Sequence, residues 1–60
     1  MNTISPVVLY MRVFGKKEGQ TTGEFAKEVA PLTGDAKFAQ EVYDFAVNNG
    51  IIPADTTLKA

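Results

Sequence analysis

The chain has 60 residues and a net charge of −1, and it contains neither histidine nor cysteine. Its length allows one small domain over residues 1–60, and its 45% hydrophobic content is too high for an intrinsically disordered chain. The missing residue types exclude disulfides and histidine–cysteine zinc sites. The charge balance disfavours a nucleic-acid binder, which usually needs a strongly basic surface.

A domain of this length buries only about 60% of the surface that its unfolded chain exposes. Without disulfides or a metal, its stability must come from packed Phe, Val and Leu side chains or from a partner that completes the core. We therefore expect a homodimer as one route to stability. The absence of cysteine fits a cytoplasmic protein, because disulfides are rare in that compartment.

The first apolar run, residues 4–14, is expected to be part of the folded domain. It is much shorter than the roughly 20 residues that a bilayer-spanning helix needs, and no basic region precedes it, so we expect no membrane association. Ser5 as N-cap, Pro6 in the first turn and Gly15 after the last turn predict a helix over residues 6–14.

A strand over residues 7–14 is the alternative for the same segment. Valine favours strands, and alternation would give one face to four apolar residues: Val7, Leu9, Met11 and Val13. Since the chain offers no second convincing strand, such a segment would pair with another copy of the protein, and the fold would be α+β.

The next segment, residues 22–31, has the start signal of a helix. Thr21 and Glu24 have the spacing of a capping box, in which each side chain binds the backbone N–H of the other residue. Pro31 removes a helical hydrogen bond and biases Ala30 away from helical angles, so we expect the helix to stop near Ala30.

The clearest helical pattern lies over residues 36–49. Asp35 is a suitable N-cap, and the Asn48–Gly50 stretch supplies a stop signal. Pro53 prevents the helix from continuing, and we expect residues 54–60 to be frayed.

The two helices contain near-copies of one pentapeptide, FAKEV at 25–29 and FAQEV at 38–42. A paired-carboxylate site formed by Glu28 and Glu41 is one hypothesis. In both copies, however, Phe, Ala and Val fall on the apolar arc of the helix while Glu points away from its centre. The repeat therefore predicts two similar amphipathic helices that form an αα-hairpin.

Together these patterns predict an all-α fold. The domain is a small three-helix structure built on the αα-hairpin, with residues 6–14 packed across it as the third helix. The predicted core consists of Leu9, Met11, Phe14, Phe25, Val29, Leu32, Phe38, Val42, Phe45 and Ile51.

Catalysis finds little support in the sequence. The hydroxyl and amine nucleophiles that remain do not lie beside an evident base. The carboxylates do not follow the calcium-loop pattern, and the glycines and lysines of loop 15–23 do not follow the order of a phosphate-binding loop. We therefore predict a non-enzymatic protein with no catalytic residues, no cofactor and no metal site.

A small helix-turn-helix-like DNA-binding protein is the alternative function. Two helices joined by the short turn 33–35 superficially fit that motif, and helix 36–49 would contact the DNA. The outward residues of that helix include one cation and two carboxylates that would face phosphates: Lys37, Gln40, Glu41, Asp44 and Asn48. This composition disfavours nucleic acid as a partner.

About half of the chain resembles short accessory proteins of tailed bacteriophages. In that pattern a Gly-Gln-Ser/Thr loop leads into a helix of the type E-F-x-x-E, then Leu-Thr and a second helix. The matching residues here are Gly19-Gln20-Thr21, Glu24-Phe25, Glu28 and Leu32-Thr33. Pro31 departs from the helix-forming residue that is usual there. The resemblance implies a phage-type protein that binds or inhibits a host factor, and it carries over no catalytic site.

The leading functional prediction is a non-enzymatic protein-binding module whose partner is a host factor or a second copy of the chain. The apolar surface of segment 7–14 exceeds what two short helices can cover, which indicates a partner surface. The candidate contacts are the outward residues of an extended segment and two lysines of the following loop: Val8, Tyr10, Arg12, Lys16 and Lys17.

Overall fold

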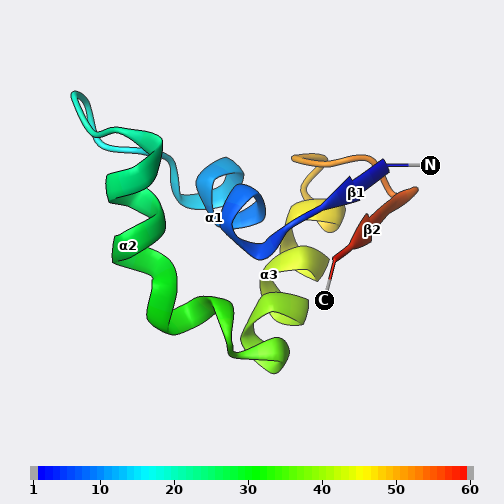
Figure 1. Cartoon of the computed structure of the whole chain (residues 1–60). Coiled ribbons are helices and arrows are strands. Elements are labelled where there is room, and N and C mark those ends of the chain that lie inside the picture. The colour runs from blue at the N-terminus through cyan, green and yellow to red at the C-terminus, as the bar shows by residue number, and fades with distance from the viewer. Residues whose placement is uncertain (1, 60) are drawn as a thin grey trace.

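The structure is a computed structural model that describes residues 2–59. Its elements follow one another as β1 (Asn2–Ile4), α1 (Pro6–Phe14), α2 (Thr22–Thr33), α3 (Ala36–Asn48) and β2 (Thr56–Leu58). Figure 1 shows α2 and α3 diverging from the turn that joins them, with α1 between them. The predicted small, mostly helical domain with three helices is confirmed, and a short two-stranded sheet is added to it.

The first apolar segment is a helix, and the alternative strand over residues 7–14 is wrong. The Ser5 Oγ accepts a hydrogen bond from the Val8 N–H at 3.3 Å, and Pro6 occupies the first turn, where its missing N–H is not needed. Gly15 ends the helix at φ 79°, and its N–H donates to the Met11 carbonyl at 2.9 Å. Local capping therefore decides the conformation of α1.

The second helix begins as predicted and ends later than predicted. The capping box is present, with the Thr21 Oγ1 accepting from the Glu24 N–H at 3.1 Å and the Glu24 Oε1 accepting from the Thr21 N–H at 2.9 Å. The expected end near Ala30 is wrong, because α2 continues through Pro31 to Thr33. Proline removes a single helical bond here, and the Thr33 Oγ1 donates to the Ala30 carbonyl at 2.8 Å within the same turn.

The third helix matches its predicted bounds to within one residue. The Asp35 Oδ1 accepts from the Phe38 N–H at 3.0 Å, and Gly50 adopts φ 69° just after the helix. The chain then folds back, because the Ile51 N–H donates to the Ala46 carbonyl at 2.8 Å.

The predicted fraying of residues 54–60 is wrong for the part of this segment that the structure describes. Strand β2 pairs in parallel with β1 in the register Asn2↔Thr56, Thr3↔Thr57 and Ile4↔Leu58. The Lys59 N–H also donates to the Ile4 carbonyl at 2.8 Å, and the Tyr43 hydroxyl donates to the Thr56 carbonyl. A partner strand more than fifty positions away therefore orders the segment, while residue 60 lies outside the described residues.

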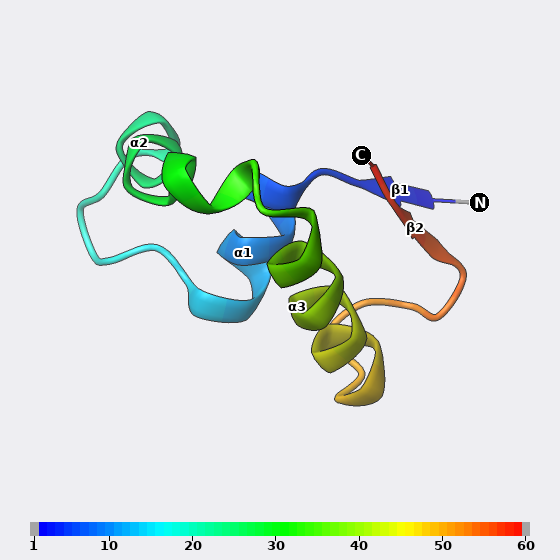
Figure 2. The ribbon, with the colours of Figure 1, turned by 90° about the horizontal axis from the view of Figure 1, so that it is seen from below.

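Figures 1 and 2 both place the small sheet at the end of the molecule opposite α2, beside α1 and α3. The core lies between the sheet and the three helices. Its buried residues are Ile4, Leu9, Tyr10, Phe25, Val29, Ala39, Val42, Ala46 and Ile52.

The predicted core is only partly correct. Leu9, Phe25, Val29 and Val42 are buried as expected, and Met11, Phe38 and Ile51 are half-buried against the core. Phe14, Leu32 and Phe45 are instead exposed, by 54%, 37% and 51% respectively. Since α2 diverges from the C-terminal half of α3, it does not cover Phe45 (Figure 1).

Leu9→Ala should be the most informative test of this core, because Leu9 is completely buried. We expect it to lower the free energy of unfolding by about 2–5 kcal/mol, roughly the whole stability of so small a core. Urea unfolding followed by circular dichroism would measure the loss. Phe14→Ala is the matched control and should unfold close to the parent, whereas equal losses in both variants would contradict the assigned core.

Pro31→Ala should stabilise the protein. The substitution restores a helical N–H that can donate to the Lys27 carbonyl, while it also gives the unfolded chain more freedom. We expect a net gain of about 1–2 kcal/mol, seen as a higher urea midpoint. A lower midpoint would show that the turn into α3 depends on the proline.

Candidate protein-binding surface

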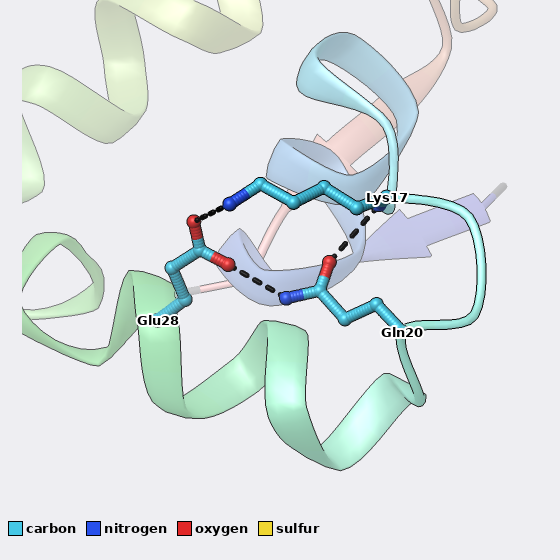
Figure 3. A network of polar contacts seen from close by, with 3 residues as sticks. All are labelled: Lys17, Gln20 and Glu28. Atoms are coloured by element: carbon cyan, nitrogen blue, oxygen red, sulfur yellow. Dashed lines mark hydrogen bonds and ion pairs between the residues drawn. The ribbon is translucent and has the colours of Figure 1, made fainter.

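The loop between α1 and α2 is fixed by a network of three polar side chains (Figure 3). The Lys17 Nζ lies 3.3 Å from the Glu28 Oε1, and the Gln20 Nε2 donates to the Glu28 Oε2 at 2.6 Å. The Gln20 Oε1 in turn accepts from the Lys17 backbone N–H at 3.0 Å. The closed network ties residues 15–21 to the side of α2.

The network also changes the acidity of Glu28. Its pKa is held below the ordinary value, first by the hydrogen bond from Gln20 and then by the hydrogen bond and positive charge of Lys17. Both partners are largely exposed to solvent, so the ion pair organises the loop more than it stabilises the fold.

A hollow of about 390 Å³ lies beside this network. We call it the Phe14 hollow. Phe25 and Val29 are its buried residues, Phe14 and Leu32 are its exposed apolar residues, and the polar network forms part of its edge. A hollow with an apolar interior and a hydrogen-bonded polar edge has the composition of a small protein-binding site.

Tyr10 holds the two exposed apolar residues of the Phe14 hollow in place. Its ring centroid lies 5.9 Å from that of Phe14 and 5.7 Å from that of Phe38, and its hydroxyl donates to the Leu32 carbonyl at 3.2 Å. Burial, and secondly the negative charge of Asp35, raise the pKa of the Tyr10 hydroxyl. The neutral donor form therefore persists at ordinary pH.

The exposed side of α3 carries a second apolar feature in an acidic setting. Phe45 is half-exposed, and Glu41 and Asp44 are its exposed neighbours on the helix. The Asp44 Oδ1 accepts a hydrogen bond from the Gln40 Nε2 at 3.0 Å. We call Glu41, Asp44 and Phe45 the acidic side.

The structure separates the five predicted contact residues. Val8 and Arg12 line one hollow together, whereas Lys17 lines the Phe14 hollow and the neighbouring Lys16 donates to the Thr22 Oγ1 at 3.4 Å. Tyr10 is completely buried and so presents no surface to a partner. It was proposed for an extended segment, and in the helical α1 it points into the core.

Phe14, Leu32 and Phe45 were missed as surface residues, because an apolar residue on a helical stripe is normally assigned to the core. Gln20 and Glu28 were missed as members of a network. Their spacing of eight positions spans a loop and a helix, so no local pattern predicts it.

The structure offers no arrangement that suggests chemistry. Among residues 2–59, no three side chains of the metal-binding types come together. Within the same residues, no helix combines the length and the hydrophobicity that a bilayer crossing requires. Binding is therefore the property that the described surface supports.

The pH dependence of Glu28 should report whether the network forms. Because its folded pKa lies below its unfolded pKa, Glu28 contributes stability above the unfolded pKa, and this is lost as the pH falls through the folded pKa. Carboxyl NMR titration should give a low pKa that Gln20→Ala raises more than Lys17→Met does. Glu24, whose pKa is lowered by Thr21, is the internal control and should not change.

Comparison with known proteins found no matching family model, no matching curated protein and no matching solved structure.

Proposed function

We propose that the protein is a non-enzymatic protein-binding module and that its partner at the Phe14 hollow is a second copy of the chain. The observation that carries the proposal is the exposure of Phe14 at the edge of a hollow whose interior is apolar. Exposed large apolar side chains beside a hollow are typical of interaction sites.

The size of the domain favours self-association. A standard interface buries roughly 800 Å² on each partner, which is about a fifth of the 4105 Å² surface of this chain. Covering Phe14, Leu32 and Phe45 would add apolar burial to a core that lacks disulfides. Such a gain is large in relation to the stability that a domain of this length has alone.

The charges indicate how two copies would meet. Lys16 and Lys17 lie next to Phe14, and Lys17 is already paired with Glu28, so Lys16 is the cation left on that side. Phe45 has acidic neighbours instead. Pairing the Phe14 hollow of one copy with the acidic side of the other brings opposite charges together around two apolar contacts.

A two-fold axis satisfies both contacts at once. In an isologous dimer, residue i of one copy contacts residue j of the other, and the reverse contact is identical. Each copy supplies one Phe14 hollow and one acidic side, so the symmetric pair closes without leaving either unused. The assembly is then a discrete homodimer and not an open chain.

A host factor is the partner that the phage resemblance implies, and it would compete for the same surface. A cytoplasmic setting remains the prediction of the cysteine-free sequence. For DNA binding, no observation speaks in favour, since α3 exposes Glu41 and Asp44 beside its single Lys37.

Sedimentation equilibrium of the parent protein tests the dimer directly. We expect dimers at micromolar to millimolar concentration, and Phe14→Ala or Phe45→Ala should shift the equilibrium to monomers without loss of helical signal. Lys27→Glu is the control, because Lys27 is exposed on α2 and does not line the hollow. A parent that stays monomeric at millimolar concentration would overturn the proposal and leave a different protein as the partner.

A charge exchange tests the predicted pairing. Lys16→Glu and Glu41→Lys should each weaken self-association, because both contacts in each homodimer then join like charges. Mixed together, the two variants should form a heterodimer with two favourable contacts. Failure of the mixture to associate, in a parent that does dimerise, would refute this pairing of surfaces.

A further inference from the structure

A second hollow lies on another side of α1 from the Phe14 hollow. It has a volume of about 280 Å³ and is lined by residues of β1, α1, β2 and the segment after α3. We call it the Arg12 hollow. Positions 12 and 14 are separated by about 200° around a helix, so Arg12 and Phe14 face different sides of α1.

The Arg12 hollow is lined by a buried hydroxyl that has no hydrogen-bond partner. Thr56 is only 5% exposed, and its Oγ1 makes no hydrogen bond within the described residues. Its carbonyl, in contrast, accepts from the Tyr43 hydroxyl. A buried hydroxyl without a partner is costly, and such groups usually bind a water molecule or a ligand.

Arg12 is the only charged residue that lines the hollow. It is exposed, and within residues 2–59 it forms neither an ion pair nor a hydrogen bond. No carboxylate among the lining residues neutralises it. A free guanidinium at the edge of a small hollow favours an anion, and its planar fork suits the two oxygens of a carboxylate.

The remaining lining selects an apolar tail. Ile4 and Ile52 are buried, and Val8 is half-buried. The volume lies at the lower limit for small-molecule sites, so the ligand must be small. A branched aliphatic chain fits such a lining better than a second charged group.

We propose that the Arg12 hollow binds a small monocarboxylate with a branched aliphatic tail. The Arg12 guanidinium binds the carboxylate, the tail lies against Ile4, Val8 and Ile52, and the Thr56 hydroxyl donates to a carboxylate oxygen. Because Thr56 lines the hollow while its Oγ1 is buried, this last bond requires a rotation about the Thr56 side chain. The proposal is independent of dimer formation at the Phe14 hollow.

Titration of the 15N-labelled parent protein with 4-methylpentanoate tests the site. We expect saturable shifts confined to the amides of β1, of residues 8–12 and of residues 52–56. The uncharged 4-methylpentanamide and inorganic phosphate should each bind at least about tenfold more weakly, since one lacks the charge and the other the tail. Equal binding of either compound, or shifts confined to other residues, would overturn the proposal.

Two variants separate binding from folding. Arg12→Gln should weaken binding of 4-methylpentanoate at least about tenfold. Thr56→Val keeps the side-chain shape and removes the unpaired hydroxyl, so it should weaken binding about threefold or more while the urea midpoint stays the same or rises. Unchanged binding in either variant would refute the assigned role of that residue.

Discussion

The structure depends on the packing of one aromatic side chain, Tyr10, where the three helices meet. Its ring contacts Phe38 of α3, and its hydroxyl donates to the Leu32 carbonyl of α2. Because Tyr10 is itself part of α1, one buried residue joins all three helices. In a domain without disulfides, such a junction takes the place of a covalent link.

The consequences of this junction extend to the surface. The ring of Tyr10 packs beside Phe14, and the hydroxyl fixes the backbone at Leu32, so both exposed residues of the Phe14 hollow are positioned from within. Loop 15–21 is positioned from outside by the network of Lys17, Gln20 and Glu28 (Figure 3). The hollow is therefore held by the core on one side and by surface polar contacts on the other.

What could be predicted from the sequence is what short-range chemistry determines. Ser5, Thr21 and Asp35 accept hydrogen bonds from backbone N–H groups three residues ahead, so the start of each helix is encoded within one turn. The sheet could not be predicted in this way. The pairing of Asn2–Ile4 with Thr56–Leu58 needs both ends of the chain to meet, and three residues carry too weak a pattern to indicate a strand.

The site was harder to predict than the fold for a related reason. Helical periodicity gives the apolar side of a helix, but it does not show whether a neighbouring element covers that side. Phe25 and Phe38 occupy the same place in the repeated pentapeptide, yet one is buried and the other only half-buried. The difference arises from the divergence of α2 and α3 (Figure 1), which depends on tertiary packing.

The composition of α1 explains why two hollows exist. A helix that is apolar on nearly every side must be covered on every side, and here two helices and a two-stranded sheet cannot surround it. Leu9 and Tyr10 take the covered sides. The uncovered sides fall at Phe14 and at Val8 with Arg12, each lining a separate hollow. Since these sides face different directions, a protein docked at Phe14 leaves Arg12 accessible, and one short helix can support two independent binding events.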